Sequence, residues 1–140
     1  MKREERLLVK YYRLSLEDEA DGESNSIRNQ RKLIEDYVEE REDLRELGSL
    51  ELSDDGYTGT NFNRPGIKRF LDLLKKNQVA CLVVKDFSRF TRDYIELGNY
   101  AEQIFPFMDV RFISVNDRYD SSFQSSHDGL EIPFKGILND

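Results

Sequence analysis

The chain has 140 residues, a length that supports one hydrophobic core and one domain. Apolar residues make up 38% and charged residues 35%, with seven Tyr and nine Phe, which excludes collagen-like, low-complexity and fully disordered classes. No apolar run is long enough to span a membrane, and the charged start does not continue as a signal peptide. Cys81 is the single cysteine, so an internal disulfide is excluded and a buried thiol in the reducing cytoplasm is expected.

The net charge of −7 conceals a segregation of charge along the chain. Residues 17–55 hold 15 acidic residues against 5 basic ones, whereas residues 61–92 hold 8 basic residues against 2 acidic ones. Because a phosphate group responds to the local potential, a chain that is acidic overall can still present one basic face to a polyanion. The charge pattern alone does not identify a function.

The predicted elements alternate between strands and helices. Strands are expected at residues 7–13, 50–53, 79–84 and 110–115. The first helix has a cap at Ser24 or Ser26, keeps a helical period as far as Leu44 and ends at Gly48. The second begins at Pro65, and the third follows Tyr94 until Pro106 ends or kinks it. Loops are expected at residues 15–25, 54–63, 88–92 and 116–129, and the start of a further helix at 131–140.

This alternation predicts an α/β fold of three layers, in which helices cover both faces of a central, mostly parallel sheet of four to five strands. The sequence has no internal repeat and no linker, so residues 1–140 are expected to form one domain. In open sheets of this kind, ligands bind at the carboxyl ends of the strands. The residues that follow the strands are therefore the candidates for a functional site.

Arginines follow three of the predicted strands. Arg13 ends the first strand and Ser15 follows it, and Arg64 comes after the second. The third is followed by Lys85, Ser88, Arg89 and Arg92. A guanidinium group offers a rigid fork of donors that suits phosphate oxygens. Arginines around a hydroxyl group are what phosphoryl transfer to serine requires, because fixed cations stabilise the charge that develops in the transition state.

Each of these residues also has a structural explanation. Ser15-x-x-Asp18 matches a helix capping box, and Arg64 before a proline could fix a turn. Arg89 and Arg92 could be solvated surface charges. Only the occurrence of arginine on three separate connections favours a site.

Other kinds of site find little support in the sequence. There is no Walker loop and no dinucleotide fingerprint after the first strand. Cys81 and His127 are too few for an ordinary zinc or iron–sulfur site or for a hydrolase triad.

Four short motifs follow one another along the chain. They are Tyr11-x-Arg13-x-Ser15, Ser26-Ile27-x-x-Gln30, Asn63-Arg64-Pro65-Gly66 and Ser88-Arg89-x-x-Arg92-Asp93. In this order and spacing they resemble the catalytic domain of the serine recombinases, the resolvase/invertase family. The likeness covers nearly the whole chain and is greatest to large transposon-encoded members, which share the Phe-Ile-Ser-Val-Asn-Asp found at residues 112–117.

The resemblance implies a resolvase-like fold and site-specific exchange of DNA strands, for the excision or integration of a mobile element. Ser15 would attack a phosphodiester of double-stranded DNA and form a 5′-phosphoserine. Arg13, Arg89 and Arg92 would hold the scissile phosphate, with Arg64 assisting. Supporting positions would be Tyr11, Gln30, Ser88, Lys85 and Asp93. The family uses no metal and no cofactor.

The sequence departs from the family in two respects. Ser88 stands where the small resolvases carry an aspartate, and Asp86, two residues earlier, is not assumed to replace it. Family members continue into a long assembly helix and DNA-binding domains, and they act as dimers and tetramers. Because this chain stops at Asp140, we expect a catalytic domain truncated before that helix, with weak self-association.

Two questions remain open at the level of sequence. No obvious general base for Ser15 is present, and one hypothesis is that the guanidinium cluster lowers the pKa of its hydroxyl. Two other functions also compete with the recombinase. One is a recombinase-like fold that serves only in assembly, and the other is a receiver-type domain phosphorylated on Asp86. A receiver needs an acidic Mg²⁺ pocket, whereas the first strand here ends in Arg13.

Overall fold

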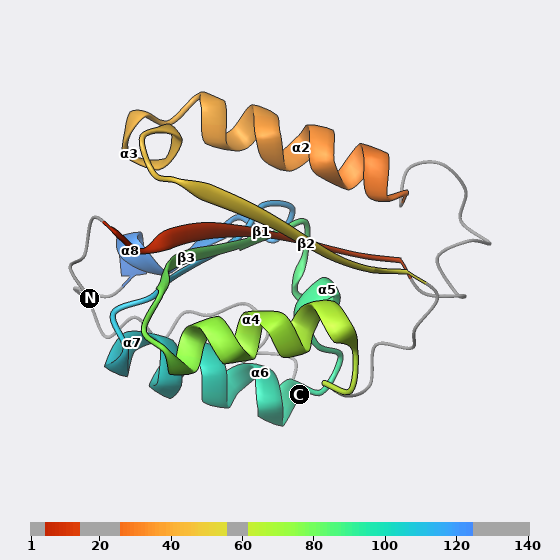
Figure 1. Ribbon diagram of the computed structural model, residues 1–140, viewed down its shortest axis with the longest axis vertical. Helices are drawn as coiled ribbons and strands as arrows, with labels where there is room; N and C mark the ends of the chain where they lie inside the picture. The colour runs from red at the N-terminus through yellow and green to blue at the C-terminus, as the bar shows by residue number, and fades with distance from the viewer. Residues whose placement is uncertain (1–4, 15–25, 56–61, 125–140) are drawn as a thin grey trace.

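The computed structural model describes residues 5–14, 26–55 and 62–124, which form a sheet with helices on both faces (Figure 1). Its strands are β1 (Leu7–Leu14), β2 (Ser49–Asp55), β3 (Val79–Val84), β4 (Arg111–Ser114) and β5 (Tyr119–Asp120). They lie in the order β2-β1-β3-β4-β5. The first four strands are parallel and β5 is antiparallel to β4, so the predicted fold class is confirmed.

The helices divide between the two faces of the sheet (Figure 1). One face is covered by α2 (Ile27–Glu39) and α3 (Glu42–Arg45). The other is covered by α4 (Pro65–Lys75), α5 (Phe87–Phe90) and the continuous segment α6 (Tyr94–Asn99), η3 (Tyr100–Ile104) and α7 (Phe105–Phe107). The last described helix, α8 (Ser121–Gln124), follows β5.

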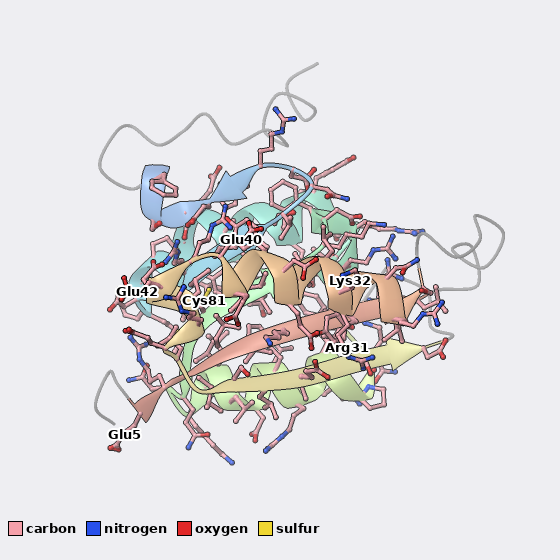
Figure 2. The ribbon with its side chains drawn as sticks, turned by 90° about the horizontal axis from the view of Figure 1, so that it is seen from above. Glu5, Arg31, Lys32, Glu40, Glu42 and Cys81 are labelled. Atoms are coloured by element: carbon pink, nitrogen blue, oxygen red, sulfur yellow. The ribbon has the colours of Figure 1, made fainter. Side chains whose placement is uncertain are left out.

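Successive side chains of β1 point to opposite faces of the sheet, so this strand contributes to both layers of the core. Leu8 and Tyr12 pack on the α2 side, whereas Val9 and Tyr11 pack on the opposite side. The neighbouring strand β3 is covered on both faces and is therefore apolar throughout. Its Cys81 is buried against α2 (Figure 2), and burial raises the pKa of the thiol, so this residue behaves as a small hydrophobe as predicted.

The predicted first helix is divided in two. Ser26 caps α2, because its hydroxyl accepts a hydrogen bond from the Asn29 N–H. The helix ends at Glu39, whereas the prediction extended it to Gly48. Val38 and Leu44 are both buried, but residues six apart in one straight helix point about 120° away from each other. The break, and the short α3 after it, turn Leu44 back toward the core.

The third helix passes through Pro106 and ends one residue later, at Phe107. The distortion expected at this proline lies before it, in the π-type turn η3, where the Phe105 N–H donates to the Tyr100 carbonyl five residues back. A proline removes one hydrogen bond and crowds the preceding turn. The wider turn accommodates that change, so the chain stays helical.

The loop predicted at residues 116–129 contains two short elements, β5 and α8, in its described part. The ring of Tyr119 lies 5.5 Å from that of Phe87 and 5.9 Å from that of Phe112. Arg111 binds both carboxylate oxygens of Asp120, at 3.0 and 2.6 Å. One aromatic residue and one ion pair therefore hold a polar segment against the sheet.

Several predictions fall on residues outside the described ranges. They concern the loop at 15–25 with Ser15 and Ser24, most of the loop at 54–63, His127 and the helix expected at 131–140. Across the described residues, no helix has the length and apolar character needed to cross a membrane.

Candidate active site

The carboxyl end of β1 is fixed by a side chain from α2. Gln30 is completely buried, and its side-chain amide forms hydrogen bonds with the backbone N–H and the backbone carbonyl of Arg13. The Arg13 N–H donates to Oε1 of Gln30 at 3.1 Å, and Nε2 of Gln30 donates to the Arg13 carbonyl at 2.9 Å. Ser15 follows two residues later in the sequence. The glutamine thus positions the strand that leads to the candidate nucleophile.

The segment predicted as a polar connection at residues 88–92 contains the helical turn α5. Phe87 and Phe90 are buried, and the ring of Phe90 lies 5.8 Å from that of Phe105. The N–H of Phe87 donates to Oδ2 of Asp117 at 2.8 Å. These contacts make α5 a fixed platform near the end of β1. Ser88 and Arg89 lie on it, between the buried residues Phe87 and Phe90.

Arginines from two other parts of the chain reach this platform, which itself carries Arg89. Nη2 of Arg13 donates to the Ser88 carbonyl at 2.7 Å, and Nη2 of Arg64 donates to the Phe90 carbonyl at 2.8 Å. Nη1 of Arg89 donates to the Arg13 carbonyl at 2.9 Å. All three are almost fully buried, with exposures of 0%, 1% and 4% in chain order. The structure therefore brings together three of the arginines that the sequence singled out.

Arg64 is the residue whose environment points most directly to an anionic ligand. Its Nε and Nη1 atoms are buried, and neither has a hydrogen-bond partner among the described residues. Its guanidinium lies 5.9 Å from the ring centre of Tyr11 and 6.0 Å from that of Phe62. Burying a cation whose donors are unsatisfied is costly. A phosphate group would supply the acceptors that this site lacks.

A buried carboxylate, Asp54, was missed by the sequence analysis, which placed it in a loop. The strand β2 continues to Asp55, and Asp54 is only 3% exposed. Its side chain accepts hydrogen bonds from the Tyr11 hydroxyl at 2.6 Å and from the N–H groups of Gly66 and Ile67 at 2.7 and 3.0 Å. Asp54 thereby fixes the first turn of α4, the helix that begins directly after Arg64.

A signal for Asp54 was present in the sequence. Leu50, Leu52 and Asp54 share one face of β2, and burial increases along that face. An acidic residue that continues an inward-facing apolar pattern is buried and must find donors.

Tyr11 and Gly66 complete this network. Burial raises the pKa of the Tyr11 phenol; the nearby Arg64 lowers it and the hydrogen bond to Asp54 raises it further, with a strong upward shift as the result. Tyr11 therefore stays protonated and donates to Asp54. At Gly66, a Cβ atom would lie 2.7 Å from the Ser53 carbonyl oxygen, so only glycine allows the helix to approach β2 this closely.

The remaining predicted residues lie around α5. Lys85 precedes the turn, and its carbonyl accepts from the Asn116 N–H at 2.8 Å. Asp93 caps α6 by accepting from the N–H groups of Ile95 and Glu96, which accounts for this residue by a structural role. Arg92 and Ser88 line an open cavity of about 430 Å³ beside α5 and α6. In the described part of the chain, no three carboxylate, thiol or imidazole groups are placed so as to hold a metal ion.

A family model decides the identity of the chain. The model for the resolvase N-terminal domain matches residues 8–133. The chain belongs to this family. It is the catalytic domain of a serine recombinase, an enzyme of DNA strand exchange. The receiver-type alternative is therefore wrong. No curated protein sequence matches the chain.

Solved structures show the same fold. The N-terminal catalytic domain of TP901-1 integrase is similar with a TM-score of 0.73 at 20% identity, covering 96% of this chain and 94% of that one. A resolvase family site-specific recombinase from Streptococcus pneumoniae has a TM-score of 0.67 at 22% identity, covering 96% and 85%. A serine recombinase from Sulfolobus solfataricus has a TM-score of 0.60 at 22% identity, covering 96% and 86%. At these identities the similarity establishes the recombinase fold.

Proposed function

We propose that this serine recombinase domain cleaves and rejoins double-stranded DNA at specific sites, with Ser15 as the nucleophile, and that it excises or integrates a mobile element. One observation carries the proposal. The buried guanidinium groups of Arg13 and Arg64 bind backbone carbonyls of α5, and that of Arg89, a residue of α5, binds the carbonyl of Arg13 at the end of the strand that leads to Ser15. The similarity to an integrase domain and to transposon-encoded proteins supports the mobile-element role.

The proposed reaction is a transesterification. The Ser15 oxygen attacks the scissile phosphorus and its proton is released, while the bond to the 3′ oxygen breaks and that oxygen takes up a proton. A 5′-phosphoserine and a free 3′-hydroxyl result. Attack of a 3′-hydroxyl on the phosphoserine reverses the reaction and rejoins the strand. Because one ester replaces another, rejoining needs no external source of energy.

The arginines contribute to this reaction electrostatically. Negative charge develops on the phosphate oxygens in the transition state, and preorganised donors stabilise it most effectively in a site from which water is excluded. Arg64 has two buried donor atoms available for this purpose. Arg13 and Arg89 are held by backbone carbonyls and so keep their orientation before DNA binds. We assign Arg92, on the adjacent cavity, to the same phosphate.

The test is to trap the covalent intermediate. The protein encoded by the gene is incubated with a supercoiled plasmid that carries the genomic DNA flanking that gene, and the reaction is stopped with denaturant. We expect a protein–DNA adduct whose peptide map places the phosphate on Ser15. The Ser15→Ala variant should form none while still bringing DNA sites together. An adduct on any other residue overturns the proposal, and DNA pairing without any adduct favours the assembly-only function.

Arginine variants measure the electrostatic contribution in the same assay. Loss of one charge-assisted contact should slow cleavage by about 10- to 150-fold in Arg13→Ala and Arg89→Ala. Lys75→Ala is the matched control, because Lys75 is exposed near the end of α4 and should leave the rate unchanged. Equal rates in all three variants would remove the arginines from the mechanism.

Self-association is part of the proposal. Strand exchange joins two DNA sites, so we propose that dimers bind each site and that a tetramer performs the exchange. Sedimentation velocity of the protein with and without its DNA should show both species. A protein that remains monomeric on cleaved DNA contradicts this arrangement. A DNA substrate also places the reaction inside the cell, in agreement with the free thiol of Cys81.

A further inference from the structure

Asp86 occupies a position that usually has a simple structural explanation. It is the N-cap residue of α5, with an extended backbone (φ −150°, ψ 169°), where an aspartate normally accepts hydrogen bonds from the first turn of the helix. Its carboxylate makes no such bond here. Asp117 caps the turn instead, since its Oδ2 accepts from the Phe87 N–H at 2.8 Å and also from the Ser114 hydroxyl at 2.6 Å. Capping therefore does not account for the Asp86 side chain.

The carboxylate of Asp86 turns toward the candidate active site. Its Oδ1 accepts a hydrogen bond from the Ser88 hydroxyl at 2.5 Å and lies 3.5 Å from Nε of Arg89. The side chain of Arg89 is 5% exposed and that of Asp86 is 25% exposed. One oxygen thus contacts both residues of the α5 turn that belong to the proposed site.

These contacts fix the orientation of two groups. The guanidinium of Arg89 is planar. Its Nη1 donates to the Arg13 carbonyl, and its Nε forms an ion pair with Asp86 that is not a hydrogen bond. One hydrogen bond and one nearby carboxylate charge favour a single orientation of the group and of its other N–H bonds. The Ser88 hydroxyl gives its single proton to Asp86, so its lone pairs remain as acceptors beside the cavity that Arg92 also lines.

We infer that Asp86 is a positioning residue of the active site, which orients the Arg89 guanidinium for the scissile phosphate and is itself held in place by the Ser88 hydroxyl. The inference rests on the proposed function. Ser88 has no carboxylate, and we assign the carboxylate of the site to Asp86, two positions earlier. Asp86 acts on the phosphate through Arg89, and Ser88 acts by holding Asp86.

The test compares Asp86→Asn and Ser88→Ala with a matched control, Asp72→Asn, which removes an exposed carboxylate on α4 that pairs with Lys76. In the protein without DNA, the NMR signal of the Arg89 Nε–H should be present in the wild type and in the control. It should broaden or exchange faster in Asp86→Asn. An unchanged Arg89 signal in this variant overturns the inference, and this readout requires no activity.

The second readout separates binding from chemistry. In Asp86→Asn, DNA affinity should be unchanged or higher, because a negative charge has been removed, while the rate of adduct formation at saturating protein falls about 10-fold. Ser88→Ala should slow the same step less. The double variant should be no slower than Asp86→Asn, because both residues act through one contact. Additive losses, or a loss of affinity at an unchanged rate, refute the assignment.

The two proposals can fail separately. If the wild type forms no adduct on Ser15, the proposed function is wrong, and the NMR signal still decides whether Asp86 orients Arg89. If the wild type reacts normally and Asp86→Asn reacts equally fast, only the role of Asp86 is refuted. Ser88→Ala removes a single oxygen, so it retains the test if Asp86→Asn proves unstable.

Discussion

Replacement of Asp54 by asparagine tests whether one buried carboxylate holds the start of α4. The aspartate accepts three hydrogen bonds: Oδ1 accepts from the Gly66 N–H, and Oδ2 accepts from the Ile67 N–H and the Tyr11 hydroxyl. An amide of the same shape can accept on one side only. Its NH₂ group would face at least one backbone N–H, which then has no acceptor.

The size of the effect follows from these contacts. A hydrogen bond to a charged group is worth about 1.5–3 kcal/mol, and a buried donor left without a partner costs about 1–3 kcal/mol. The Asp54→Asn variant loses the charge at all three bonds and one acceptor outright, so its free energy of unfolding should fall by about 3–5 kcal/mol. Tyr11→Phe removes a single bond and should cost about 1.5 kcal/mol.

Urea unfolding followed by circular dichroism measures these losses. The control is Asp72→Asn, which removes a half-exposed ion pair and should cost less than about 0.5 kcal/mol. A loss of stability no larger than that of the control would refute the role of Asp54.

Three further predictions concern the same scaffold. Gln30→Leu leaves the buried Arg13 N–H without an acceptor, so unfolding should become easier by about 2–3 kcal/mol, measured by urea titration; a neutral result would show that another group replaces the amide. Gly66→Ala places a Cβ atom 2.7–2.8 Å from two oxygens and should lower the melting temperature markedly, whereas an unchanged value would mean that the helix shifts freely. Burial works to raise the pKa of Asp120, but the hydrogen bonds from Arg111 and the neighbouring serine outweigh it, and the pKa is lowered. The wild type should therefore be about 2 kcal/mol more stable than Asp120→Asn near neutral pH. This difference should decrease once the pH falls below about 4, the pKa of an aspartate in the unfolded chain, and should vanish when the pH passes below the lower pKa of Asp120 in the folded protein. A difference that persists in acid would contradict the ion pair as its cause.

The sequence analysis predicted those features that local pattern determines. The apolar run 79–84 became the fully covered strand β3, and Pro65 opens α4 as expected. The arrangement of Arg13, Arg64 and Arg89 was also predictable, because parallel strands end at one edge of the sheet. The recombinase resemblance, carried by four motifs, is confirmed by the family match over residues 8–133.

The errors arose where distant contacts outweigh local pattern. Residues 88–92 have a polar sequence, yet α5 forms there because Phe87 and Phe90 insert into a core built by segments distant in sequence. Leu44 follows Val38 out of helical phase, and the chain breaks the helix in order to bury both. Asp86 received no role at the recombinase site because it is offset by two positions from Ser88, and the sequence does not show that Asp117, thirty-one residues after Asp86, accepts the hydrogen bond from the first N–H of α5.

The π-type turn in the third helix has a consequence for how that helix faces the sheet. Leu97, Ala101 and Phe105 are all buried, at a regular spacing of four residues. In an ordinary α-helix such a row drifts about 40° around the axis with each step, so the last of these side chains would rotate toward the edge of the contact. The wider turn Tyr100–Ile104 offsets this drift, so that all three side chains belong to the same core cluster as Phe112 of β4. Deleting one residue from this turn would restore a regular helix and rotate Phe105 out of the aromatic cluster. Phe90 would then lose the contact with the Phe105 ring that helps to hold α5 in place.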